Sequence, residues 1–376
     1  MSGARTYLDC NATTPLRREA RAAMIAALDV VGNPSSPHAE GRKARAMVED
    51  TREQIAALIG AKPAEVVFTG GGTEANNTVL AARWEAILVA GVEHDSVLVP
   101  ARSSQSQVIE LAVGEDGVVR RDSLAEAMRR SSGGRALLSL QMANNETGVL
   151  QPVADVARDA REHGLAVHTD AVQAAGRMPI DFARLGVAYL TLSAHKLGGP
   201  QGVGAIAVRD GAVLPSLIAG GGQERRRRAG TENVAAIAGF GAAAEAAQAD
   251  LAQMPRVRAL RDQLEAQARS ITPQAIIVGE AADRLPNTTS LALPDASAET
   301  LVIALDLKGI AVSAGAACSS GKVGVSHVLA AMGLPAQIAR AAIRISLGPA
   351  STERDVASFL DAWGQIALGR RQRAVA

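Results

Sequence analysis

Short apolar runs alternate with helix-forming segments over more than half of the chain, and this alternation constrains the fold more than any other feature. Runs with the length and composition of strands lie at residues 65–69, 86–90, 107–113, 135–142, 165–170, 189–193 and 203–208. Strands that alternate with helices usually form βαβ units, in which neighbouring strands run parallel. The sequence therefore predicts an α/β protein built on a mainly parallel sheet.

Length and charge narrow the class of function. The 376 residues leave room for two domains, at roughly 150 residues per domain. Lysine plus arginine number 39 and aspartate plus glutamate 38, so the charge gives no reason to expect a nucleic-acid or anionic membrane partner. The first ten residues lack the apolar segment of a secretory signal, and the longest apolar run, 234–244, is too short to span a membrane. We therefore expect a cytoplasmic protein that acts on small molecules.

A glycine-rich segment at residues 65–77 has the features of a phosphate site. An apolar run leads into three consecutive glycines that end at Gly72, and a helix is predicted to begin at Thr73. Unpaired backbone N–H groups and the positive end of a helix dipole would then face one point. The spacing fits neither a Walker loop nor a dinucleotide-binding loop. An ordinary turn between a strand and a helix explains these residues about equally well.

His94, Asp170 and Lys196 each come at or just after the end of an apolar run, where ligands bind in open α/β sheets. A buried carboxylate at Asp170 requires a cation, and a protonated ring nitrogen would be one. A lysine held in the interior at the end of a strand can lose its proton and attack a carbonyl, as a Schiff-base lysine does. Asp170 precedes Lys196 by 26 residues, one strand-helix-strand step, so they should occupy neighbouring strand ends. Each residue alone also has a plain reading: a surface histidine, a helix cap or a solvated loop lysine.

The two cysteines and one arginine are further candidates. We assign Cys10 to packing, because small buried cysteines are common and usually inert. Cys318 lies in a loop of glycine, alanine and serine, which favours a nucleophile over a packing residue. Arg344 interrupts an apolar alternation at 341–348, where it would bind a substrate carboxylate or form a structural salt bridge.

Together these segments carry a family resemblance that extends over nearly the whole chain. The motifs fall in the family's order at residues 8–15, 32–38, 68–77, 93–97, 144–148, 168–173, 193–200, 230–234, 314–321 and 344–348. The chain resembles the fold-type I pyridoxal-phosphate enzymes of the class V aminotransferase group. More narrowly, it resembles the cysteine desulfurases, both housekeeping and nitrogenase-associated.

The resemblance implies a fold and a quaternary structure. The large cofactor-binding domain would comprise residues 16–250 and hold a mainly parallel seven-stranded sheet. Residues 1–15 and 251–376 would form a smaller α+β domain that carries the catalytic cysteine loop. The family forms homodimers, in which the loop at 220–233 crosses to the other subunit. There Thr231 would complete the phosphate site of the partner subunit.

The resemblance also assigns roles within the site. Lys196 would bind pyridoxal 5'-phosphate (PLP) as a Schiff base, and Asp170 would pair with the pyridinium nitrogen. His94 would stack on the ring and assist proton transfer at the substrate thiol. The remaining cofactor contacts would come from Gly72, Thr73, Ser193 and His195 at the phosphate, and from Gln173 and Asn145 around the ring oxygen. Arg344, assisted by Asn33, would anchor the substrate carboxylate.

The implied activity is removal of sulfur from L-cysteine, giving L-alanine and a persulfide on Cys318. An iron-sulfur scaffold or another protein would accept the sulfur, and Cys318 would meet metal only transiently, through a persulfide to a nascent cluster. Two alternatives stay open. A selenocysteine lyase or another class V enzyme would keep Lys196 and Asp170 without requiring Cys318, whereas a non-catalytic sulfur-relay protein would use Cys318 alone.

Overall fold

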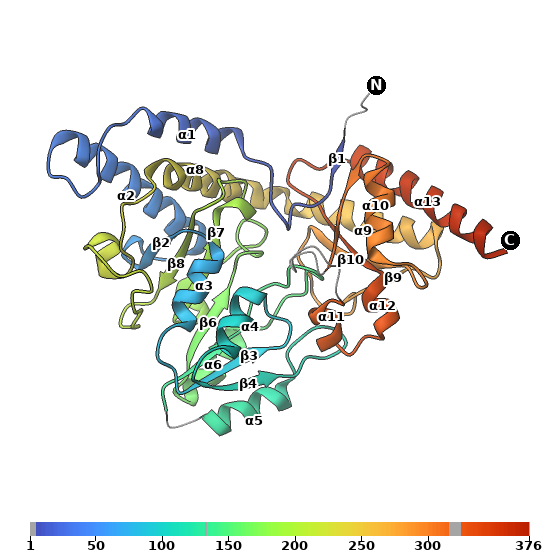
Figure 1. Ribbon diagram of the computed structural model, residues 1–376, viewed down its shortest axis with the longest axis horizontal. Coiled ribbons are helices and arrows are strands. Elements are labelled where there is room, and N and C mark those ends of the chain that lie inside the picture. The colour runs from blue at the N-terminus through green and yellow to red at the C-terminus, as the bar shows by residue number, and fades with distance from the viewer. Residues whose placement is uncertain (1–4, 132–133, 316–324, 376) are drawn as a thin grey trace.

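The computed structural model describes residues 5–131, 134–315 and 325–375 and is organised around one large sheet (Figure 1). The strand order is β2-β8-β7-β6-β5-β3-β4. Its strands are β2 (Val66–Thr69), β8 (Gly204–Val208), β7 (Tyr189–Ser193), β6 (Ala166–Asp170), β5 (Ala136–Ser139), β3 (Ala86–Ala90) and β4 (Gln107–Leu111). The predicted α/β class with a mainly parallel seven-stranded sheet is confirmed.

One strand, β8, runs against its neighbours. It pairs antiparallel with both β7 and β2, while the pairs from β7 to β4 are all parallel. Only residues 194–203 separate β7 from β8, and a parallel crossover needs about a dozen residues or more. Because β2 and β7 each oppose β8, they run in the same direction. The carboxyl ends of β2, β3, β5, β6 and β7 therefore meet at one edge of the sheet.

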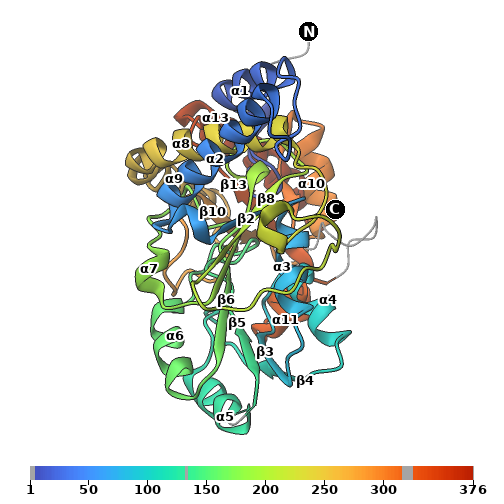
Figure 2. The ribbon, with the colours of Figure 1, turned by 90° about the vertical axis from the view of Figure 1, so that its left-hand side faces the viewer.

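Helices cover both faces of this sheet, as the two ribbon views show (Figures 1 and 2). Alternate residues of β3 divide between two cores: Leu88 packs in the larger one, and Ile87 and Val89 in the smaller. The larger core joins the sheet to α2 (Ala39–Ile59), α5 (Arg121–Ser131), α6 (Val153–Glu162) and α8 (Val234–Asp250). The smaller core joins it to α3 (Gly72–Leu80) and α4 (Asp95–Arg102). Burial on both faces explains why the strands read as nearly continuous apolar runs.

The C-terminal part forms a second, antiparallel sheet with strand order β12-β13-β10-β9. Its strands are β12 (Ser313–Ala314), β13 (Ala342–Ser346), β10 (Thr288–Ala292) and β9 (Ile276–Ile277). A third core joins this sheet to α9 (Met254–Ile271), α10 (Ala298–Asp306) and α13 (Glu353–Val375), and includes Leu8 from the N-terminal segment. The larger core also includes residues of this part, such as Val278 and Val328, so the two parts pack against each other. We retain the domain division at 16–250 against 1–15 with 251–376 as a proposal.

The N-terminal segment connects the two parts. Strand β1 (Thr6–Tyr7) pairs in parallel with β11 (Ile310–Ala311), and Asp9 bridges to Ser346 of β13. The remaining helices are α1 (Arg18–Leu28), α7 (Phe182–Leu185), α11 (His327–Ala331) and α12 (Ala336–Ala341), with 3-10 turns at Pro63–Glu65, Ala194–Lys196, Gln223–Arg226 and Leu251–Gln253. Within the described ranges, none of the helices combines the length and apolar character that a membrane crossing requires.

Candidate active site

A pocket of about 360 Å³ opens at the edge of the large sheet where the parallel strands end. Most of the predicted site residues line it: Gly72, Thr73, His94, Asn145, Asp170, Gln173, Ser193, His195, Lys196 and Arg344. Asn11 and Ala12 of the N-terminal segment complete one wall. The pocket thus combines loops of the large sheet with residues of the second sheet and of the N-terminus.

Lys196 ends the 3-10 turn that follows β7. Its Nζ donates hydrogen bonds to the carbonyl oxygens of Asn11 at 2.6 Å and Ala12 at 2.8 Å. Its own carbonyl accepts a hydrogen bond from Thr14 Oγ1 at 2.9 Å. The N-terminal segment therefore orients the amine within the pocket, a contribution that the local pattern around Lys196 did not predict.

Asp170 is the last residue of β6 and is buried. Because β6 and β7 pair in parallel, with Asp170 opposite Thr191, Asp170 and Lys196 follow neighbouring strands, as predicted. Asp170 Oδ1 accepts the backbone N–H of Val172 at 2.9 Å, and Oδ2 accepts Asn76 Nδ2 at 2.7 Å. No ion pair joins this carboxylate to a cationic side chain in the described part of the chain. A buried carboxylate that faces a pocket in this way suits a protonated ring nitrogen.

Asn76 connects Asp170 to His94, a role that no motif in the sequence predicted. Its side-chain nitrogen also donates to Ser96 Oγ at 2.8 Å, which lies 2.8 Å from His94 Nδ1. The backbone N–H of Ser96 donates to the same Nδ1 at 3.1 Å, so His94 caps helix α4. Because a backbone N–H can only donate, Nδ1 is an acceptor, and neutral His94 carries its hydrogen on Nε2. Burial lowers the pKa of His94, which favours this neutral form.

The hydrogen-bond chain continues below the pocket through His168. Thr191 Oγ1 donates to Asn76 Oδ1 at 2.6 Å and lies 3.2 Å from His168 Nε2. Ser139 Oγ lies 2.8 Å from the other ring nitrogen, Nδ1. Burial lowers the pKa of His168 to about 4, so this ring is neutral at physiological pH. Every donor in the chain has an acceptor, which holds Asn76 and hence Asp170 in one arrangement.

A glycine turn leads into α3, as predicted, although the helix begins at Gly72, one residue before Thr73. Gly71 has φ 148°, a conformation that favours glycine. A Cβ on Gly72 would lie 3.1 Å from Val172 Cγ2 and 3.3 Å from Ser193 Cβ, so a side chain there would fill the space between loops. The first N–H groups of α3 have no partner within the helix. Small residues, free donors and a helix N-terminus at the pocket wall suit a phosphate group.

His195 borders the pocket beside Lys196. Its Nδ1 lies 3.2 Å from Thr13 Oγ1. Burial, followed by the charges of Lys196 and Arg177, lowers the pKa of His195 to about 4. The ring is therefore neutral at physiological pH, and it would serve an anionic group as a hydrogen-bond donor without adding a positive charge.

Arg344 on β13 meets the acidic partner that its buried position requires. Its Nη2 lies 2.7 Å from Asp9 Oδ1, and its Nη1 donates to the carbonyl oxygen of Asn145 at 3.3 Å. The structural salt bridge considered from the sequence is therefore present. Arg344 also lines the pocket, and its buried Nε has no partner among the described groups. An unused donor at a pocket wall suits a carboxylate ligand.

Two of the predicted residues that the structure describes, Asn33 and Thr231, do not line this pocket. Asn33 accepts the backbone N–H of Ser35 at 2.9 Å through its own Oδ1, which stabilises the turn at 32–38. Thr231 lies in the segment before α8, and its predicted place is in the partner subunit. Cys318 lies outside the described residues. Cys10 is buried, as expected for a packing residue, and burial raises the pKa of its thiol to about 11.

Comparison with known proteins agrees with this fold and site. The sequence profile of the class-V aminotransferase family matches residues 6–359, so the chain belongs to that family. The cofactor of this family is pyridoxal phosphate.

The curated relatives narrow this to cysteine desulfurases. The chain is 40% identical to cysteine desulfurase IscS of Dictyoglomus turgidum, covering 96% of this chain and 94% of that protein. It is 43% identical to a cysteine desulfurase of Cereibacter sphaeroides, covering 95% and 94% respectively. The solved structure of a NifS-like protein from Rickettsia africae superposes with a TM-score of 0.90 at 35% identity, covering 96% and 99%. The chain is thus a PLP enzyme of the cysteine desulfurase type.

Proposed function

We propose that the protein removes sulfur from L-cysteine, releases L-alanine and carries the sulfur as a persulfide on Cys318. The observation that carries the proposal is one pocket lined by both the buried carboxylate of Asp170 and the amine of Lys196, which follow neighbouring strands. This pair suits a cofactor with a cationic ring nitrogen and a carbonyl group. Pyridoxal phosphate, when bound, withdraws electrons from the substrate's Cα.

Different residues around the pocket would contact different parts of the cofactor. Asp170 would hold the ring nitrogen, and His94 would cover the ring. The phosphate would bind at the start of α3, through Gly72 and Thr73, with Ser193 and His195 beside it. Gln173 and Asn145 would lie around the ring oxygen. These assignments are the ones that the family resemblance implies, and the positions of all these residues in one pocket and the chemistry of each group support them.

The same pocket provides for the substrate. Arg344 would orient the amino-acid carboxylate, because its buried Nε is an unused donor at the wall. Lys196 would take the proton from Cα and return it, since its amine is the only lysine nitrogen that lines this described pocket. The thiolate of Cys318 would then attack the substrate sulfur. The new S–S bond forms as the C–S bond breaks, and its electron pair stays on carbon, which gains a proton and leaves as L-alanine.

An exposed apolar face lies at the end of α1 and in the segment just after it. Ile25, Leu28 and Val31 are 53%, 72% and 82% exposed, unusually high for large apolar side chains in one short segment. We propose that a homodimer covers this face and brings Thr231 to the phosphate site of the partner subunit.

An iron-sulfur scaffold is the proposed sulfur acceptor, with only transient metal contact at Cys318. A cytoplasmic location is also proposed, and the free thiol of Cys10 is compatible with it.

The deciding experiment measures L-alanine and sulfide from L-cysteine with a thiol reductant present. Wild type should form both, and Cys318→Ser should form neither above background while keeping its bound PLP and its yellow colour. Cys10→Ser is the matched control and should retain the activity. Alanine formation by Cys318→Ser would contradict the persulfide route and indicate another class V activity. Wild-type protein that stays colourless with added PLP would instead indicate a sulfur-relay protein.

A further inference from the structure

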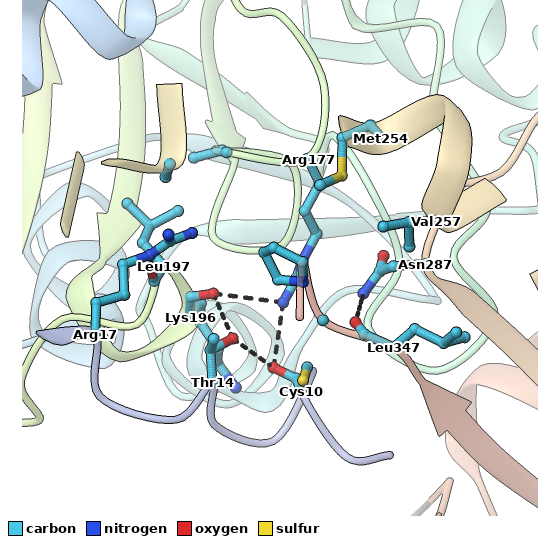
Figure 3. Close-up of a pocket in the computed structure, with 15 residues that line it drawn as sticks. Cys10, Thr14, Arg17, Arg177, Lys196, Leu197, Met254, Val257, Asn287 and Leu347 are labelled. Atoms are coloured by element: carbon cyan, nitrogen blue, oxygen red, sulfur yellow. Dashed lines mark hydrogen bonds between the residues drawn. The ribbon is translucent and has the colours of Figure 1, made fainter. Parts of the chain in front are cut away.

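Arg177 belongs to the segment that follows β6, and its side chain lies beside Lys196 and the N-terminal segment (Figure 3). Its side chain is buried, and no carboxylate forms an ion pair with it among the described residues. Burial lowers the pKa of Arg177 to about 10, so the guanidinium still carries its charge at neutral pH. A buried cation without an acidic partner is costly. Its stabilisation therefore depends on neutral hydrogen-bond acceptors.

The acceptors of Arg177 all belong to segments that border the candidate active site. Nη1 donates to the backbone carbonyl of Gln173 at 2.9 Å and also contacts Gln173 Oε1. Nη2 donates to the carbonyl of Cys10 at 3.2 Å and reaches the carbonyl of Lys196 at 3.5 Å. Figure 3 shows Arg177 between Cys10 and Lys196, with Thr14 bonded to the same two carbonyls. One side chain thus joins three loops of the site.

The contact with Gln173 fixes which end of its amide faces the pocket. A guanidinium has only donors, so the oxygen of the amide must face Arg177. The nitrogen therefore points the opposite way, where Nε2 donates to the carbonyl of Asn11 at 3.1 Å. That carbonyl also accepts Lys196 Nζ at 2.6 Å. Since Nε2 has two hydrogens, one remains for a ligand in the pocket that Gln173 lines.

We propose that Arg177 is a positioning residue for the cofactor site, which presents Gln173 to the pocket as a hydrogen-bond donor and secures the backbone at Cys10 and Lys196. The proposal rests on the proposed place of PLP in this pocket. A donor at Gln173 recognises an oxygen with free lone pairs, such as the ring oxygen of the cofactor. Without Arg177 only the hydrogen bond to the carbonyl of Asn11 orients the amide, so the orientation that presents its oxygen to the pocket, and repels that group, becomes less costly.

The test is the dissociation constant of PLP, measured on full-length holoenzyme by equilibrium dialysis. Arg177→Met removes the donors, and PLP affinity should fall about tenfold or more, the usual effect of losing a hydrogen bond from a charged group. Arg177→Lys keeps a cationic donor and should restore most of the affinity. Arg209→Met is the matched control, because Arg209 likewise has no carboxylate partner among the described residues and donates to backbone carbonyls, those of Val187 and Phe182, while it does not line this pocket. It should lower stability but leave PLP binding unchanged.

Gln173→Glu separates positioning from a purely structural role. The new carboxylate would pair with Arg177, so the unfolding midpoint should be unchanged or higher. A carboxylate cannot donate to the pocket, so PLP should nevertheless bind about tenfold more weakly or worse. Wild-type PLP affinity in Gln173→Glu would overturn the proposal. This test does not depend on how well Arg177→Met folds.

A double-mutant cycle gives the second criterion. If Arg177 acts through Gln173, Arg177→Met should have little further effect on PLP affinity in a Gln173→Ala background. The same loss in both backgrounds would show that Arg177 only stabilises the fold and would refute the proposal. These experiments measure PLP binding, whereas the proposed function is tested by alanine formation from L-cysteine. A failure of one proposal can therefore be distinguished from a failure of the other.

Discussion

Acid should destabilise this protein through His168, and the surroundings of the ring determine by how much. His168 is completely buried between Ser139 and Thr191, each within hydrogen-bond distance of one ring nitrogen. Burial lowers the pKa of His168 from 6.5 to about 4, although the carboxylate of Asp170 acts in the opposite direction. The imidazole of His168 therefore binds a proton more weakly in the folded protein than in the unfolded chain.

The magnitude follows from the two pKa values of His168, 6.5 when unfolded and about 4 when folded. Each unit of difference corresponds to about 1.4 kcal/mol. The stabilising contribution is complete above pH 6.5 and is lost as the pH falls towards 4, because the unfolded state then binds more protons. At pH 5 the loss is about 2 kcal/mol relative to pH 8. This is a large part of the usual net stability of a domain.

The perturbation is His168→Gln, which keeps a donor and an acceptor but does not titrate. Denaturant unfolding of both holoenzymes at a series of pH values gives two stability curves, and their difference removes effects that the proteins share. The variant should be less stable at pH 8, and the gap should narrow by about 2 kcal/mol at pH 5. A gap that stays constant over this range would refute the assignment of a buried neutral ring.

Three further predictions concern other buried groups. Glu224→Gln should lower the free energy of unfolding by about 2 kcal/mol, because buried Arg52, whose Nη1 and Nη2 each lie 2.9 Å from Glu224, loses its buried countercharge and keeps only the more exposed Glu49; a loss near zero in denaturant unfolding would contradict this. Cys10 should resist thiol alkylation at pH 8 until the protein unfolds, since its pKa is about 11; rapid labelling of Cys10 itself in the native protein, located by peptide mass spectrometry, would disprove it. Asn76→Leu should weaken PLP binding about tenfold, because Asp170 loses a donor 2.7 Å away; unchanged binding in equilibrium dialysis would show that this contact is dispensable.

The sequence by itself determined the parts of this protein that depend on local pattern. Alternating strand and helix segments specified the α/β class, because side-chain periodicity reports which faces are buried. Parallel strands end at one edge, so the positions of Asp170 and Lys196 after successive strands were enough to place them side by side. The glycines before Thr73 indicated the cradle, since a close approach of backbone to a ligand excludes side chains. The strand count, the cofactor and the activity came from the family resemblance.

Only the tertiary structure decided which distant groups meet. Asp9 pairs with Arg344 across 335 positions, and Asn76 reaches Asp170 across 94. The orientation of the Gln173 amide likewise depends on Arg177, whose role no local pattern distinguishes from that of a surface arginine. The physical reason is that hydrogen-bond direction and charge pairing depend on the geometry between side chains, which packing of the whole chain sets. Sequence periodicity predicts which face of a helix or strand a residue occupies. Its hydrogen-bond and charge partners come from distant segments, which only the tertiary structure places against that face.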